Sequence, residues 1–180
     1  MVVITLLEAA QDLDWAEVST AQKSNARVYT SLSLGSNTEL EMASSSYFIR
    51  LLEVHPGHEG QLIVGTLKIV DFSEADVSSY EAILYVWGPN MSQVIYVNKQ
   101  PMRVSHTLSR ARRHLSKLRT MWIDAICISQ VDLAERGSQV LLMQKIYSTA
   151  KSVVVWLGKS PRGLSHTLTD VTKVSKDEHP

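Results

Sequence analysis

Three apolar runs, each ending at polar residues or glycine, limit most strongly the folds open to this chain. They read YEAILYVWG over 80–88, MWIDAICISQ over 121–130 and VVVWLG over 153–158. β-Branched and aromatic residues dominate them, as is typical of buried strands that run into loops. Because apolar strands separated by amphipathic helices require a sheet covered on both faces, we predict a three-layer α/β fold with a mainly parallel sheet.

Two further pairs of strands are expected around these runs. A strand from Tyr47 to Val54 is followed by a turn at Pro56-Gly57, and residues 63–72 form its partner. A β-hairpin insertion is predicted over 94–104, with Asn98-Lys99 at the turn because Asn tolerates the left-handed backbone.

Two helices are predicted between the strands. Ser105 or Thr107 can cap a helix over 108–118, whose apolar positions follow the spacing of one buried face. Asp132 should cap a helix that runs to Tyr147, with Glu135 reaching back from the first turn. We expect one side of this second helix to be apolar, with Leu133, Val140, Met143 or Gln144, and Tyr147.

The length of 180 residues suits one domain with extensions. Residues 1–46 are rich in Ser, Thr and Asn in their second half, so we predict a flexible or loosely docked extension with one short helix over 6–15. The α/β domain is expected over 47–158. Residues 159–180 would then be a tail or a truncated continuation of it.

Composition excludes several classes of function. The 18 basic and 18 acidic residues balance, which gives no global field for nucleic acid or an anionic membrane. The single cysteine excludes a disulfide framework, and the six histidines show no metal-ligand spacing. No run approaches the roughly 18–20 apolar residues of a membrane span, and no secretory signal is evident. We expect a soluble, cytoplasmic protein without a metal site.

Polar and aromatic residues gather where the predicted strands end. Ligands of open α/β sheets bind beyond the carboxyl ends of the strands, so this position predicts a ligand-binding crevice. Its candidate residues are Tyr85, Trp87, Gly88, Asp124, Gln130, Arg136 and Gln139. The alternative is a hydrogen-bonded cluster that only holds the strand-to-helix turns together.

The candidate catalytic residues are Asp124 and Glu135. Asp124 falls within an apolar strand, where an ionised carboxylate needs a partner, and Arg136 is the nearest in sequence. A structural Asp124–Arg136 ion pair therefore competes with a catalytic role. Cys127 has no histidine in a recognised relation to it, which favours a buried, inert thiol.

The three runs, in this order, resemble the HET (heterokaryon incompatibility) domain of filamentous fungi. The usual HET pattern reads YEALSYVWG, then LWIDAICINQ, then IYSxAxxVIVWLG, and a lead-in similar to residues 47–57 commonly precedes it. The resemblance thus covers about 47–158. It implies a role in self/non-self recognition and programmed cell death, exerted by self-association or by binding a protein partner.

HET domains are in turn distantly similar to TIR domains, which implies a TIR-like or flavodoxin-like sheet. Some TIR domains cleave NAD with a glutamate on the helix after the third strand. Here no glutamate follows Gly158 until Glu178. The resemblance therefore leaves two interpretations open: an interaction module without a cofactor, or an enzyme that takes NAD or another small molecule as substrate.

Overall fold

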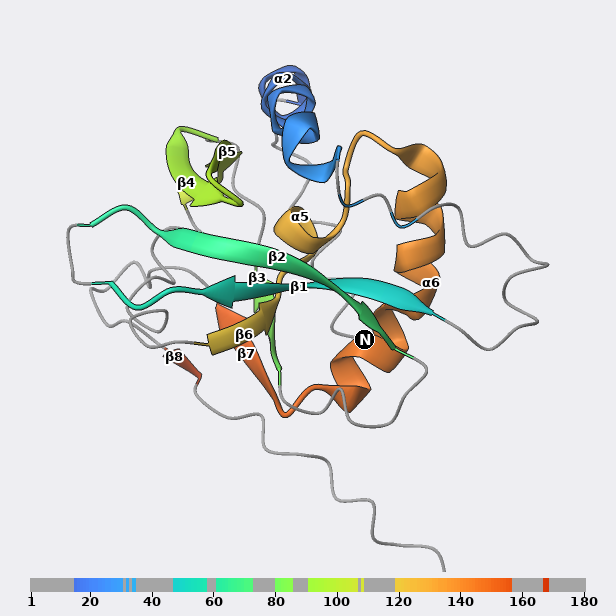
Figure 1. Ribbon diagram of the computed structural model, residues 1–180. Coiled ribbons are helices and arrows are strands. Elements are labelled where there is room, and N and C mark those ends of the chain that lie inside the picture. The colour runs from blue at the N-terminus through green and yellow to red at the C-terminus, as the bar shows by residue number, and fades with distance from the viewer. Residues whose placement is uncertain are drawn as a thin grey trace, which may run out of the picture.

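The computed structural model describes residues 15–30, 32, 34, 47–57, 61–72, 80–85, 91–106, 108, 119–156 and 167–168. A single sheet of eight strands, in the order β5-β4-β2-β1-β6-β3-β7-β8, organises this part of the chain (Figure 1). The helices are α2 (Trp15–Asn25), η1 (Ala26–Tyr29), α5 (Asp124–Cys127) and α6 (Leu133–Thr149). The strands are β1 (Phe48–Val54), β2 (Val64–Asp71), β3 (Glu81–Tyr85), β4 (Gln93–Val97), β5 (Gln100–Val104), β6 (Arg119–Trp122), β7 (Ser152–Trp156) and β8 (Thr167–Leu168).

The sheet is mixed, so the α/β class is confirmed while the prediction of a mainly parallel sheet is wrong. Only β6-β3-β7 and the β2-β4 pair are parallel. β1 pairs antiparallel with both β2 and β6, and two further antiparallel pairs, β4-β5 and β7-β8, lie at the two ends of the sheet. The reason is that β1 enters between β2 and β6 in the opposite direction to both, while β5 and β8 turn back beside β4 and β7.

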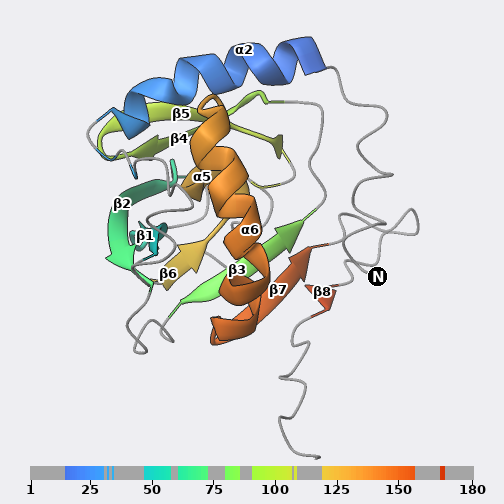
Figure 2. The same ribbon diagram turned by 90° about the vertical axis from the view of Figure 1, so that its right-hand side faces the viewer.

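Helices cover the sheet unevenly among the described residues. α6 lies along one face, and α2 lies across the β4-β5 hairpin at one end of the sheet (Figure 2). The predicted helix over 108–118, which would supply a further layer, lies outside the described residues except for Leu108.

The predicted hairpin is confirmed, and its turn is a two-residue turn. Asn98 and Lys99 both have positive φ, 51° and 65°, as the type I′ turn of a tight hairpin requires. The Asn98 side chain also accepts a hydrogen bond of 3.0 Å from the Leu67 backbone N–H. The asparagine therefore both permits the turn and joins the hairpin to β2.

The second apolar run predicts a strand over 121–128, and this prediction is wrong beyond Trp122. Asp124–Cys127 forms one helical turn, in which the amides of Cys127 and Ile128 donate to the carbonyls of Ile123 and Asp124. The Asp124 carboxylate accepts a hydrogen bond from the Ala125 amide, a local contact that competes with strand pairing. A short apolar run fits a buried helical turn as well as a strand.

Helix α6 begins where predicted but turns a different face to the sheet. The Asp132 carboxylate accepts the Glu135 amide at 3.0 Å, which confirms the cap. The buried residues are Glu135, Gln139, Leu142 and Ile146. Leu133 and Val140, expected on the packed side, are 69% and 52% exposed. Two polar side chains can occupy the buried face because both find partners there.

The N-terminal segment packs against the rest of the chain. Residues 15–30 fall within the extension predicted over 1–46, and Ala21, Asn25, Val28 and Tyr29 in this segment are buried. The Asn25 amide group pairs with both backbone groups of Arg103, at 2.9 and 2.8 Å. Segment 15–30 thus extends the covered part of the sheet at β5. Helix α2 starts where the predicted helix over 6–15 was to end, and residues 1–14 lie outside the described part.

Candidate functional site

The parallel strands bring three of the polar or aromatic residues to one edge of the sheet. Tyr85, the last residue of β3, pairs with Trp156 at the end of β7. β6 runs beside β3, with Trp122 next to Ala82, and the chain then reaches Asp124. The predicted meeting of strand ends is therefore present. Two crevice candidates, Trp87 and Gly88, lie outside the described residues.

Two tyrosine hydroxyls lie in the electrostatic field of Asp124. Burial raises the pKa of Tyr85 well above its usual value of about 10, and the Asp124 charge raises it further, whereas a hydrogen bond with the Ser105 side chain lowers it. Burial, and then Asp124, likewise raises the pKa of Tyr147. Both phenols are therefore neutral donors near a half-buried carboxylate. The Tyr147 hydroxyl donates to the Ile83 carbonyl at 3.4 Å, so this phenol already has a partner within the protein.

The turn that carries Asp124 is closed by Gln130. The Gln130 amide donates to the Asp124 carbonyl at 3.0 Å and to the Ile128 carbonyl at 3.4 Å. This contact matches the alternative in which the polar residues stabilise the turn. Gln130 and Asp124 thus lie together as predicted, with the glutamine side chain bonded to the backbone.

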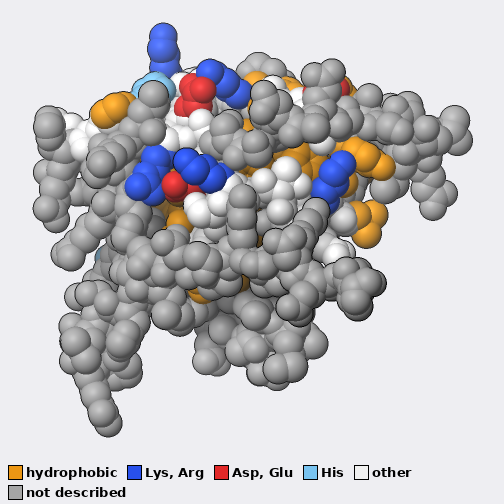
Figure 3. Space-filling view, turned by 90° about the horizontal axis from the view of Figure 1, so that it is seen from below, with side chains coloured by type: hydrophobic (Ala, Val, Ile, Leu, Met, Phe, Trp, Pro, Cys, Tyr) orange, Lys and Arg blue, Asp and Glu red, His pale blue; other side chains and the backbone are white. Residues whose placement is uncertain are grey.

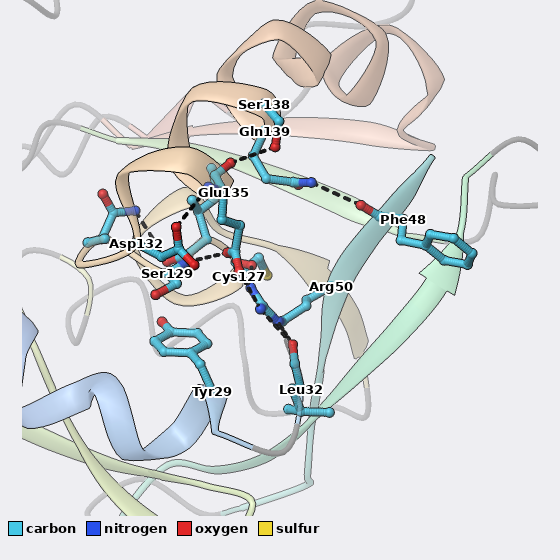
Figure 4. A network of polar contacts seen from close by, with 12 residues as sticks. Tyr29, Leu32, Phe48, Arg50, Cys127, Ser129, Asp132, Glu135, Ser138 and Gln139 are labelled. Carbon is cyan, nitrogen blue, oxygen red and sulfur yellow. Dashed lines mark hydrogen bonds and ion pairs between the residues drawn. The ribbon is translucent and has the colours of Figure 1, made fainter. Parts of the chain in front are cut away.

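Glu135 is the acid of a buried ion pair. Its two carboxylate oxygens accept from Nη1 and Nη2 of Arg50 at 2.6 and 2.7 Å, and one also accepts the Ser129 amide at 2.7 Å (Figure 4). Arg50 and Glu135 are 0% and 3% exposed. The Glu135 carboxylate is thus buried with its partners, and it lies beyond the helix cap, where it accepts the Ser129 amide.

The two remaining candidates lie elsewhere on α6. Gln139 is buried and donates to the Phe48 carbonyl of β1 at 2.9 Å, so it fixes α6 to the sheet. Arg136 is exposed. Between described residues the ion pairs are Arg50–Glu135, Lys68–Glu53 and Arg119–Glu81, and the expected Asp124–Arg136 pair is not one of them.

Sequence reasoning missed Arg50, Tyr29, Ser105 and Tyr147 as neighbours of these residues. For Arg50 a signal existed, because a cation within the apolar run Phe48–Val54 needs a buried partner. The same argument was applied only to Asp124, and it predicted an ion pair with Arg136 instead of the pair between Arg50 and Glu135. Ser105 and Tyr147 carry no comparable signal, since only the fold brings them to β3.

Metal and thiol chemistry find no support in the part of the chain that is described. No group of three or more His, Cys, Asp or Glu side chains there is placed to hold a metal ion. Burial raises the pKa of the Cys127 thiol to about 12, which leaves it protonated and unreactive. Within the same residues, no helix has both the length and the apolarity to cross a membrane.

Together these features define an α/β domain with a polar cluster at the carboxyl ends of its parallel strands. The sequence matches the family described as Heterokaryon incompatibility protein (HET) over residues 80–179, more than half of the chain. The chain belongs to the HET family.

A similar protein also carries heterokaryon incompatibility in its name. The chain is 32% identical, over 164 aligned residues and 80% of its own length, to the Neurospora crassa protein "Heterokaryon incompatibility protein 6, OR allele". It spans about a quarter of that protein, 24% of its length. No solved structure matches the chain.

Proposed function

We propose that this chain is a signalling module of fungal heterokaryon incompatibility that acts in the cytoplasm and triggers cell death by self-association. Membership of the HET family and the similarity to a heterokaryon incompatibility protein support the process. The observation that carries the mechanism is the outer face of α6.

Three large side chains on the solvent-facing side of α6 are apolar, beside the exposed Arg136 and Gln144. Leu133, Val140 and Leu141 are 69%, 52% and 70% exposed, and a side chain at Gly137 would meet no atom within 4 Å. Positions 133, 137, 140 and 141 share one side of a helix. Contiguous exposed apolar surface of this kind marks interaction sites.

A second copy of the chain suits this face. Leu133 and Leu141 lie four residues to either side of Gly137, so a two-fold axis at Gly137 would set Leu133 of one copy beside Leu141 of the other on an antiparallel α6. Glycine at the centre would let the two helices approach closely. The chain carries no formal net charge to oppose such pairing, and acidic side chains lie next to basic ones on the face in Figure 3.

The test is the mass of the protein in solution by size-exclusion chromatography with light scattering. We expect a dimer or larger species for the wild type and a monomer for Leu133→Glu/Leu141→Glu. Leu62→Glu is the matched control, because Leu62 is 60% exposed but lies outside α6. Expression of the same variants in a filamentous fungus should abolish cell death only for the α6 variant. A wild type that is monomeric at all concentrations refutes self-association.

Enzymatic cleavage of NAD is the second candidate. In favour of it, the parallel block β6-β3-β7 has the second strand, the first and the third side by side, the order of flavodoxin-like sheets that bind ligands at strand ends. We extend the proposal to a TIR-like fold on this ground. Asp124, which is half-buried, is then the candidate carboxylate, because Glu135 is buried in its ion pair with Arg50.

Release of nicotinamide from NAD by the purified protein tests this candidate. Turnover that Asp124→Ala abolishes would establish it, with Glu135→Ala as the comparison for a buried carboxylate. An absence of turnover, or turnover that neither substitution changes, eliminates it.

A further inference from the structure

The turn that carries the candidate site, residues 123–130, is held by side chains from outside the region matched by the family. That region begins at Tyr80, whereas the side chains in question belong to Tyr29 and Arg50. Tyr29 lies in η1 and Arg50 in β1. Neither was expected to contact this site turn.

Arg50 contacts three separate segments. Its Nη1 donates to the Cys127 carbonyl in the site turn at 3.1 Å, and its ion pair with Glu135 fixes the start of α6. Its Nε and Nη2 both donate to the Leu32 carbonyl, at 2.8 and 2.6 Å (Figure 4). Because the planar guanidinium has donors in fixed directions, these contacts depend on one another.

Tyr29 completes the arrangement from the N-terminal side. Its hydroxyl donates to the Ile126 carbonyl at 2.9 Å, and its ring lies 4.9 Å from the Arg50 guanidinium carbon. Ile126 and Cys127 follow Asp124 closely in α5. The N-terminal segment therefore reaches the site turn twice, once directly through Tyr29 and once through Leu32 and Arg50.

We propose that residues 26–30, Leu32 and Arg50 form a clamp that sets the conformation of the site turn, with Arg50 as its positioning residue. Docking of the N-terminal segment is then coupled to the placement of Asp124. Any partner or modification that displaces this segment would loosen the site turn. The proposal rests on the contacts of the candidate site and does not depend on self-association.

Hydrogen exchange of the full chain, followed by mass spectrometry, tests the clamp. Tyr29→Phe keeps the ring over Arg50 and removes only the hydroxyl. Loss of this buried hydrogen bond should speed exchange about tenfold in peptides covering 123–130 while β3 and β7 stay unchanged. Tyr96→Phe is the control, because Tyr96 is exposed on β4.

Arg50→Lys is the second variant, since lysine can pair with Glu135 but cannot reproduce the fork to Leu32 and Cys127. It should show the same local loosening and a changed side-chain carboxyl NMR signal of Asp124. Exchange that is unaltered at 123–130, or that rises equally in β3 and β7, would overturn the clamp. An Arg50→Lys variant that behaves as wild type would overturn the positioning role.

Discussion

Alanine at two glycines, Gly65 and Gly137, should change stability in opposite directions. Gly65 lies in β2 opposite Val54 of β1 on one side and Val97 of β4 on the other. A Cβ atom there would lie 2.9 Å from the Glu53 carbonyl oxygen and 2.9 Å from a methyl carbon of Leu52. The carbonyl cannot move away without disturbing the β1-β2 ladder. At Gly137 a Cβ atom would meet nothing within 4 Å.

The magnitudes follow from these surroundings. Overpacking of a close-packed site costs about 1–3 kcal/mol of stability. Replacing glycine by alanine also reduces the conformational entropy of the unfolded chain, which offsets about 0.5–1 kcal/mol of that cost. The difference is roughly 0–2.5 kcal/mol, and because one 2.9 Å contact is with a backbone oxygen we expect Gly65→Ala to destabilise by about 1–2.5 kcal/mol, or roughly 2–10 °C in Tm for a protein of this size. Gly137→Ala should stabilise the fold of the single chain by about 1 kcal/mol, roughly 2–4 °C, because alanine favours a helix interior.

Differential scanning calorimetry of the two variants beside the wild type measures both shifts under one condition. The comparison is robust because the substitutions add the same methyl group, so only the surroundings differ. A Gly65→Ala variant as stable as Gly137→Ala would refute the argument that the β2 backbone is confined between β1 and β4.

Three other predictions concern the ion pair, the hairpin and the buried phenols. In urea unfolding, Glu135→Ala should lower the free energy of unfolding by about 3–5 kcal/mol because it leaves a buried guanidinium uncompensated. The double variant Arg50→Met/Glu135→Leu removes both charges and should lose no more stability than Glu135→Ala. A loss equal to the sum of those measured for Arg50→Met and Glu135→Leu separately contradicts this. Lys99→Gly should stabilise by about 1 kcal/mol in thermal unfolding by relieving a left-handed backbone (φ 65°), and an unchanged Tm would argue against that strain. Four tyrosines have raised pKa values in the folded state, so the unfolded state releases protons first and stability should fall as pH rises above about 10. They are Tyr29, Tyr80, Tyr85 and Tyr147. Urea midpoints between about pH 9 and 11, read beside phenolate absorbance, test this, and ionisation of all phenols before unfolding would contradict it.

Local signals in the sequence predicted the parts of the fold that local chemistry determines. Asn98 at a two-residue turn and Asp132 before α6 satisfy nearby backbone groups, so their roles can be predicted without knowledge of the fold. The apolar runs located β3 and β7 for the same reason. The direction of a strand depends on partners distant in sequence. The antiparallel pairing of β1 with β6 therefore could not be predicted from local signals.

The candidate site was predicted less well because buried polar residues were judged by their chain neighbours. Asp124 was assigned Arg136, twelve residues away, whereas the buried acid is Glu135 and its partner is 85 residues distant at Arg50. The packed face of α6 could not be recognised from the sequence, because Glu135 and Gln139 are polar and polar residues are expected to be exposed. Both are buried because they have hydrogen-bond partners from other elements. Tyr85 and Asp124 could be placed together because both follow from the ends of parallel strands.

The matched family region, residues 80–179, is therefore not the folding unit that the structure displays. β6 pairs on one side with β3 from within that region and on the other with β1 from before it. A chain that began at residue 80 would expose one edge of β6 and leave the Glu135 carboxylate buried without Arg50. Loss of the ion pair alone would cost about 3–5 kcal/mol. This is a large share of the roughly 5–15 kcal/mol that stabilises a domain. We expect such a fragment to lack cooperative thermal unfolding by circular dichroism, and a fragment starting at residue 15 to retain it. Cooperative unfolding of the shorter fragment would show that the clamp and β1 are dispensable for the site turn.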